Sequence, residues 1–421
     1  MDAGNDPDAL FRRYRREAVL LHQPWPPQAG PPTNSHFGGL PRLPEGCAWP
    51  RTSSGKPLHF LAEIDCAEIP FPTILPERGV LFFFGRGDPY AWNTEPPSDA
   101  CRVLYAPDAS ARSAPRQSPA DLPPPNRPAS EPNNVHPAWP IVPLRFDTFP
   151  EVTAFPDPSE PDKRGWRRFL DRFVRAPAST EISADMRDAY EEQLGARRAA
   201  ALVTATGAHP PASPMTWRES IDAGGTIFDF AASGPQSFPE RWAYVHHLLL
   251  EILDRPLLYS GEAGPGARTT EAERWLGRSR EGPLHRPVAE DDRQALRTWL
   301  SSFDDCPRLV FRGCVGTMRS WAGDPAHAAL IPDHVYAACA SSFYGYHEHD
   351  PRFSQMLGHA PACHQARSVD DPAICLLSID TDLALGWYVA DMGGRCTFWI
   401  TPQDLARRDF SQVVGRLDGR S

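Results

Sequence analysis

The sequence contains no apolar run of the about 18 residues that a membrane-spanning helix requires. Acids precede the arginines near its start and no apolar stretch follows them, so we do not expect a secretory signal. Basic residues are the minority, 43 against 53 acidic ones, and the net charge of −10 disfavours a phosphate backbone as partner. We therefore expect a cytoplasmic protein that binds neither membranes nor nucleic acid.

Closely spaced cysteine pairs are also missing. The nine cysteines are widely separated, and no Cys-x-x-Cys occurs. This pattern favours reduced, buried thiols over a disulfide scaffold or a zinc ribbon. Neither Gly-x-Ser-x-Gly nor His-Glu-x-x-His is present, so the sequence offers no standard hydrolase motif.

Proline, by contrast, is abundant: 48 of 421 residues, roughly twice the average usage. Eleven prolines lie between positions 107 and 143. Proline cannot donate to a sheet ladder, so we interpret residues 106–143 as a proline-rich surface loop in an extended conformation. One hypothesis for this loop is docking to domains that recognise polyproline II segments.

Hydrophobic periodicity divides the rest of the chain into β-rich ends and a helical middle. Strands are predicted for LHFLAEID, GVLFFF, IVPLRF, AICLLSID, LGWYVAD and RCTFWI. Helices are predicted over 8–22, 164–175 and 183–203, after a capping box of Ser237 and Glu240, around Leu296 to Phe303, and after an N-cap at Thr401.

These elements predict an α+β, β-rich fold, which we divide into five segments. They are an N-terminal helix and proline-rich lead (1–32), a first β half (33–105), the proline-rich loop (106–143), a helix-rich middle region (144–339) and a second β half (340–421).

A shift of 315 residues superimposes the two β halves. It places Leu61 on Leu376, Ile64 on Ile379, Asp65 on Asp380, Gly79 on Gly394 and Phe83 on Phe398. In both copies an apolar strand ends in Ile-Asp, and a glycine and an aromatic strand follow at the same spacing. The pattern predicts an internal duplication with a helical insertion between the copies.

Two stretches carry a resemblance to a known family. HFGGLPRLPEGCAWPRTSSGKPLHFLAEIDCAEIP with LPERGVLFFF, and SQMLGHAPACHQ with CLLSIDTDLALGWYVADMGGRCTFWITPQDLARRDFSQV, resemble the YwqG-like family of bacterial proteins, a domain of unknown function. The resemblance implies a β-rich fold of two similar halves and no established reaction. The family often carries a histidine where this sequence has Ser354. YwqG-like proteins can occur near secreted toxin genes, which implies an immunity-like partner by association.

Aromatic and acidic residues at predicted strand ends are the candidate binding residues. Trp49 and Trp387 lie beside proline or glycine, and we expect both to reach a groove rimmed by Asp65, Asp380 and Asp391. Such a surface suits a protein or peptide partner. The same acids could instead cap turns at the strand ends.

A second set of residues has ligands that zinc favours. On a strand His347 and His349 share a face, and His359 and Cys363 follow within reach, but the spacing matches no standard zinc site. An exposed loop is the competing interpretation, and we predict no cofactor. Our leading hypothesis is a non-catalytic binding protein, and the alternative is a metal- or carboxylate-assisted hydrolase using His347, His349, Asp380 or Asp391.

Overall fold

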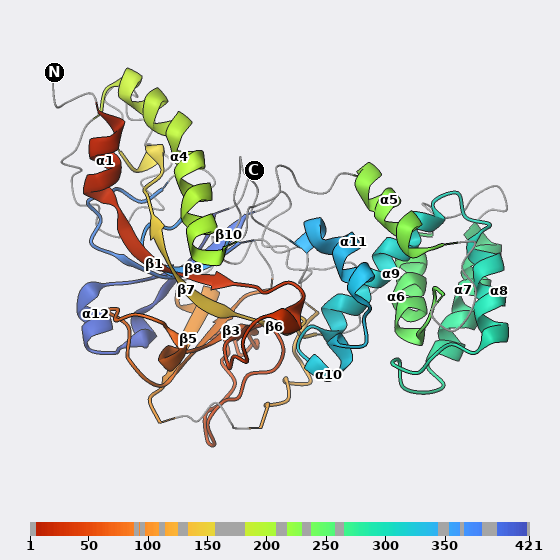
Figure 1. The fold of residues 1–421 in the computed structure, drawn as a ribbon. Helices are drawn as coiled ribbons and strands as arrows, with labels where there is room; N and C mark the ends of the chain where they lie inside the picture. The colour runs from red at the N-terminus through yellow and green to blue at the C-terminus, as the bar shows by residue number, and fades with distance from the viewer. Residues whose placement is uncertain are drawn as a thin grey trace.

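A computed structural model shows how these segments are arranged in space. It describes residues 6–87, 92, 97–108, 114–124, 134–155, 182–207, 217–229, 237–256, 265–343, 353–362, 366–380 and 394–418. The fold is α+β, as the sequence predicts: two antiparallel sheets lie together at one side and a body of helices lies at the other (Figure 1). No helix in these ranges is long and apolar enough to cross a membrane.

Each sheet is built mainly from one of the two predicted halves. The first sheet has the order β5 (Cys101–Ala106), β4 (Val80–Gly85), β3 (His59–Asp65), β2 (His36–Phe37), β6 (Trp139–Pro140). The second sheet has the order β11 (Val414–Asp418), β10 (Arg395–Ile400), β9 (Ile374–Asp380), β8 (Gln355–Leu357), β1 (Arg16–His22), β7 (Val142–Thr148).

The shift of 315 residues carries β3 onto β9 and β4 onto β10 without changing their pairing. Asp65 is opposite Val80, and Asp380 is opposite Arg395. A β-bulge interrupts the register at matching positions, next to Phe60 in one pair and between Phe398 and Trp399 in the other. Because register is fixed by which side chains face the core, this agreement extends the sequence repeat to the backbone.

The next strand of each sheet also matches. Gly38 and Gly39, after β2, have positive φ angles of 58° and 70°, and Leu357 and Gly358, at the end of β8, have φ angles of 63° and 65°. The hydroxyl groups of Ser35 and Ser354 accept from the backbone N–H of Asp65 and Asp380, respectively. The two sheets therefore share one plan, as an internal duplication predicts.

The main hydrophobic core lies between the two sheets. Leu61, Leu81 and Phe83 of the first sheet belong to the same buried cluster as Leu377 and Phe398 of the second. The rings of Phe83 and Phe398, which the repeat makes equivalent, meet edge to face with centroids 5.3 Å apart. Direct contact between equivalent residues is what a pseudo-two-fold relation between two halves produces.

The outer face of the first sheet is apolar and covered. Phe60, Phe82 and Phe84 pack there with Trp49 and with Leu122 of the proline-rich segment. Described parts of residues 106–143 thus do more than form a surface loop: Leu122 is buried and β6 pairs with β2. The segment therefore covers part of the outer face of the first sheet and adds a strand to it, which its proline content alone did not predict.

The outer face of the second sheet is covered in part by a long helix, α4 (Ala184–Thr206), as Figure 1 shows. Leu202 of this helix packs on Ala18, Leu20 and Phe146, which belong to β1 and β7. Ser183 is the N-cap of this helix and its side chain accepts from the N–H of Met186, so the predicted helix over 183–203 is confirmed.

The N-terminal prediction of one helix over 8–22 is wrong. Helix α1 (Pro7–Tyr14) ends before Arg15, and the chain continues as strand β1. Val19 faces the inter-sheet core and Leu20 faces α4, so the run AVLL is buried on both sides. A strand buried on both faces has no alternating pattern to distinguish it from a helix in sequence. The N-terminal segment therefore supplies a strand of the second sheet.

The helical body is a separate hydrophobic cluster between β7 and β8 in the chain. It comprises α5 (Trp217–Ile227), α6 (Trp242–Asp254), α7 (Pro265–Ser279), α8 (Glu290–Leu300), α9 (Cys306–Trp321), α10 (Pro325–Ala328) and α11 (Asp333–Phe343). Short helices α3 (Pro97–Ala100) and α12 (Pro402–Ala406) accompany the sheets. Trp25 joins the two parts, because it packs against both clusters and its Nε1 donates to the Tyr336 carbonyl.

The predicted capping box of α6 is wrong. The helix begins at Trp242, and Arg241 precedes it in an extended conformation without a side-chain cap. Trp242 N and Ala243 N donate instead to the carbonyls of Arg286 and Leu284, so neighbouring backbone satisfies the first turn. The N-cap at Thr401 is confirmed, with its hydroxyl accepting from Asp404 N.

Of the other predicted elements, most are confirmed and two lie outside the described residues. LHFLAEID, GVLFFF, IVPLRF, AICLLSID and RCTFWI form β3, β4, β7, β9 and β10. The helix around Leu296 is α8. LGWYVAD and the helix over 164–175 lie outside the described residues.

Candidate functional site

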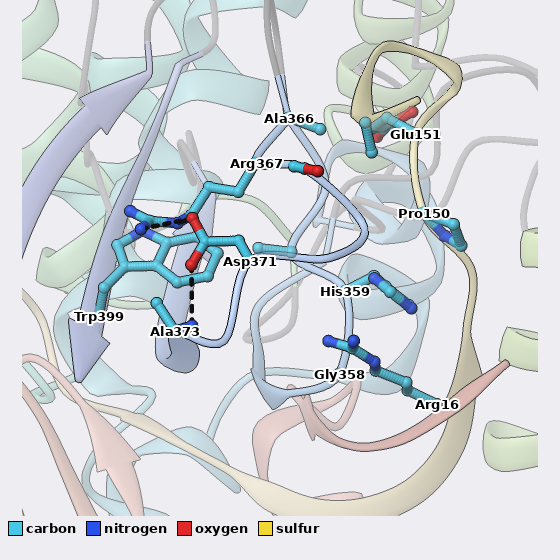
Figure 2. Close-up of a pocket in the computed structure, with 13 residues that line it drawn as sticks. Arg16, Pro150, Glu151, Gly358, His359, Ala366, Arg367, Asp371, Ala373 and Trp399 are labelled. Carbon is cyan, nitrogen blue, oxygen red and sulfur yellow. Dashed lines mark hydrogen bonds and ion pairs between the residues drawn. The ribbon is translucent and has the colours of Figure 1, made fainter. Parts of the chain in front are cut away.

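A pocket lies at one end of the second sheet, and the empty space in and above it, open solvent included, is about 370 Å³. It forms where β1 begins, where β10 ends, and where the loops after β8 and before β9 pass between them (Figure 2). Its lining residues are Arg16, Pro150, Glu151, Ala154, Gly358, His359, Ala360, Ala366, Arg367, Ser368, Asp371, Ala373 and Trp399.

One wall of the pocket is a stacked and ion-paired group. Arg367 donates through Nη2 and Nε to Asp371 Oδ2 at 2.7 and 2.9 Å, and its guanidinium lies 4.7 Å from the Trp399 ring centroid. Asp371 Oδ1 also accepts from Ala373 N at 2.8 Å. Figure 2 shows these side chains together on one side of the cavity. The arginine is thereby held over the indole by a cation–π contact and an ion pair.

His359 lies on the opposite side. Its Nε2 donates to the Tyr14 carbonyl at 2.7 Å, and its backbone N–H donates to Thr148 Oγ1 at 3.0 Å. Burial and the Arg16 guanidinium lower the pKa of His359 to about 3. The ring is therefore neutral at physiological pH, with its proton committed to Tyr14.

Glu151 and Arg16 carry the remaining charges that line the pocket. Glu151 is mostly buried and pairs with Arg198 Nη2 at 2.9 Å while accepting from Ala362 N. Arg16 makes a long contact of 3.4 Å from Nη2 to the Val369 carbonyl. Burial lowers the pKa of Arg16, and the nearby Asp370 carboxylate offsets part of that effect. A guanidinium has five N–H donors, so Arg16 retains donors for a ligand.

A row of buried polar side chains continues from the pocket along the outer face of the same sheet. It consists of Gln355, Ser378, Thr397 and the ion pair between Asp380 Oδ2 and Arg395 Nη2 at 3.1 Å, each at most 6% exposed. Two hydrogen bonds join this polar row to the pocket. Gln355 Nε2 donates to the His359 carbonyl at 3.1 Å, and Trp399 Nε1 donates to Thr397 Oγ1 at 2.8 Å.

The structure separates the residues predicted to form a groove. Trp49 is only 9% exposed, its Nε1 donates to the Leu58 carbonyl, and its ring packs edge to face on Phe84, contacts that do not favour a groove wall. Asp65 caps a short turn through Ala67 N, as the competing interpretation proposed. Asp380 lies in the polar row. Trp387 and Asp391 lie outside the described residues, and binding by any of the five stays a prediction.

The proposed zinc ligands fall mostly outside the described part as well. His347, His349 and Cys363 are not among the described residues, and His359 is engaged with Tyr14. Within the described ranges, no group of three or more His, Cys, Asp or Glu side chains could hold a metal ion. Zinc binding was the alternative to the predicted absence of a cofactor, and the described residues test neither.

Sequence reasoning missed Arg16, Arg367 and Trp399, although one signal was available. The repeat aligns Val80, Phe82 and Phe84 with Arg395, Thr397 and Trp399. Apolar residues in one copy therefore correspond to polar or amphipathic residues in the other. Such a difference at equivalent strand positions indicates that the second copy carries a site.

The family comparison agrees with this architecture. A family model described as a domain of unknown function, DUF1963, matches residues 35–213 and 302–418, together more than half of the chain. The unmatched interval contains α5, α6, α7 and α8, and the matched segments contain both sheets except β1. No curated protein matches the chain. The protein belongs to the DUF1963 family, the family of this domain of unknown function.

Proposed function

We propose that this protein is a non-catalytic binding protein of the YwqG type, whose pocket on the second sheet receives an acidic group of a protein or peptide partner in the cytoplasm. An immunity-like role would be one form of such binding. The observation that carries the proposal is the pairing pattern in the pocket: its acids and its histidine are occupied, whereas Arg16 keeps donors to offer.

The pairing pattern disfavours general acid–base chemistry at this pocket. A catalytic base needs a pKa near the working pH and a free lone pair directed at the substrate. Glu151 and Asp371 each hold an arginine, and the pKa of His359 is about 3. The alternative hydrolase would depend on His347, His349 and Asp391, which are not described, and on Asp380, which holds Arg395.

Recognition chemistry is better supported by the same residues. Arg16 can donate two parallel hydrogen bonds to a carboxylate, the geometry that guanidinium groups favour. Arg367 and Trp399, in cation–π contact with each other, line the other side of the cavity. A partner segment with an aspartate, a glutamate or a free carboxyl terminus would meet complementary groups on both sides.

A peptide selection tests the proposal. A random peptide library is selected on the full-length protein, and the Kd of each enriched peptide is compared with that of its amide version, in which Asn or Gln replaces the acid. We expect enrichment of acidic residues and about tenfold tighter binding of the acidic form, since a hydrogen bond to a charged group contributes about 1.5–3 kcal/mol.

The matched controls are two arginine variants. Arg16→Gln should remove the preference for the acidic peptide, whereas Arg280→Gln, an exposed arginine of the helical body, should keep it. Peptides without acidic residues, or an acid preference that survives Arg16→Gln, would contradict the proposal.

A further inference from the structure

The two acids that line the pocket use their carboxylates differently. Asp371 uses both oxygens, because Oδ2 is in an ion pair and Oδ1 accepts from Ala373 N. In Glu151, the ion pair with Arg198 Nη2 at 2.9 Å and the hydrogen bond from Ala362 N at 3.2 Å both end on Oε1. Within the described residues no hydrogen bond uses Glu151 Oε2, so this oxygen is left as an acceptor.

This oxygen is open to the cavity. Glu151 lines the pocket and its side chain is 16% exposed. Among the described residues, Oε2 is not one of the buried polar atoms that lack a partner. A donor group of a ligand can therefore reach Glu151 Oε2 by replacing solvent.

Arg16 lines the same cavity and carries the opposite charge. It is an exposed residue at the start of β1, and its guanidinium makes one long contact to the Val369 carbonyl. No ion pair joins Arg16 to Glu151 in the part of the chain that the structure describes. Figure 2 shows both residues on the side of the cavity where His359 lies. This wall thus offers a charged donor and a charged acceptor that do not satisfy each other.

The opposite wall offers no such groups. Arg367 and Asp371 pair with each other there, and the Arg367 guanidinium also lies over Trp399. Among the described lining residues, the charges left for a ligand are therefore one guanidinium and one carboxylate oxygen. A ligand that carries a carboxylate and an ammonium group complements both.

We propose that the pocket binds a carboxylate and an ammonium group of one ligand, and that a peptide partner supplies both from an acidic residue at its N-terminus. The side-chain carboxylate of that residue accepts from Arg16, and its α-ammonium group donates to Glu151 Oε2. Charge-assisted hydrogen bonds of this kind are stronger than neutral ones. The inference rests on the proposed function and adds a second group that the partner must present.

The test compares four probes at pH 6.5, where an α-amino group is protonated. They are the peptide Glu-Ala-Ala-Ala-Ala, its N-acetylated form, the peptide Ala-Ala-Glu-Ala-Ala, and free glutamate, and all three peptides carry a C-terminal amide. Their Kd values for the full-length protein are measured by calorimetry. We expect the first peptide to bind about tenfold more tightly than each of the other peptides, a difference of about 1.4 kcal/mol.

Free glutamate separates the two sources of this chemistry. It carries both groups but no peptide chain, and we expect it to bind more weakly than the first peptide. An equal or lower Kd for free glutamate would assign the pocket to a free amino acid and overturn the peptide N-terminus as its ligand.

The protein variant that isolates the ammonium contact is Glu151→Gln. Its amide oxygen can keep the contacts of Oε1, while its amide nitrogen replaces the acceptor Oε2 by a donor. This variant should lose the preference for the free N-terminus. Glu273→Gln is the matched control, because Glu273 is an exposed residue of α7 in the helical body, and it should keep the preference.

The outcomes separate this inference from the proposed function. Equal Kd values for the free and the acetylated peptide, or a preference for the free N-terminus that survives Glu151→Gln, would overturn the inference. If both peptides still bind more weakly to Arg16→Gln, the acidic-partner function stands without it. If Arg16→Gln binds both peptides as the parent protein does, the proposed function itself is contradicted. Failure of all four probes to bind would overturn the inference as well.

Discussion

The lowered pKa of His359 makes a quantitative prediction about stability. At pH 8 the imidazole is neutral in the folded and the unfolded chain. As the pH falls below about 6.5, the unfolded chain takes up a proton that the folded chain excludes until about pH 3, so the stability contributed by the neutral ring is lost. Between pH 8 and pH 5, this linkage lowers the free energy of unfolding by about 2 kcal/mol.

The variant His359→Gln isolates this effect. Glutamine does not titrate and can still donate to the Tyr14 carbonyl, while all other histidines are the same in both proteins. Urea unfolding, followed by circular dichroism at pH 8 and pH 5, should show that the variant loses about 2 kcal/mol less than the parent protein.

Nuclear magnetic resonance of the His359 ring provides a second readout. The expected result is the tautomer protonated at Nε2 with no titration between pH 5 and pH 8. Titration of His359 near pH 6.5, or an equal loss of stability by both proteins on acidification, would contradict a neutral, buried His359. Either result would also mean that His359 could accept a proton near neutral pH and act as a general base.

Three further predictions concern the sheets and the pocket. Phe83 and Phe398 meet edge to face, so replacing each and both by leucine should reveal a coupling of about 0.5–1.5 kcal/mol in a double-mutant cycle. The free energies are measured by urea unfolding, and additive effects of the two replacements would contradict the coupling. Gly358→Ala should destabilise the protein by about 2 kcal/mol or more in the same assay. The φ angle of Gly358 is 65°, and an added Cβ would lie 2.7 Å from Ala18 Cβ and closer still to Thr148. An unchanged urea midpoint would contradict this prediction. Trp399→Leu should weaken binding of the selected acidic peptide about two- to fivefold, because Arg367 loses its contact with the indole and must be ordered on binding, at a cost of about 0.5–1 kcal/mol. Unchanged affinity in calorimetry would exclude Trp399 from recognition.

Much of the sheet architecture could be predicted from the sequence because two copies of the same strand pair can be compared with each other. Asp65 and Asp380 mark equivalent strand ends. The 315-residue shift places β3 on β9 and β4 on β10, and the two pairs have the same register. Hydrophobic pattern and glycine positions fix register strongly when one face is buried. The role of β1 could not be predicted, because its partners β7 and β8 are distant in sequence and its apolar run fits either helix or strand.

The pocket was harder to predict for the same reason. Arg16 lies on β1, His359 follows β8, and Trp399 lies near the end of β10, so only the folded sheet brings them together. Trp49 was chosen for its position beside a proline, but neighbouring phenylalanines bury it. The local sequence identifies residue types that are suited to recognition. Only the comparison of the two copies shows that the polar residues lie on the second sheet, where the first sheet has apolar ones.

In the proposed function, Arg16 recognises an acidic group of the partner. The most direct measurement is a thermodynamic cycle from four Kd values: an enriched acidic peptide and its amide version, each with the parent protein and with Arg16→Gln. We expect a coupling of about 1.5 kcal/mol or more, which is an at least tenfold change in the ratio of the Kd values. A coupling near zero, with both proteins preferring the acidic peptide equally, would contradict it.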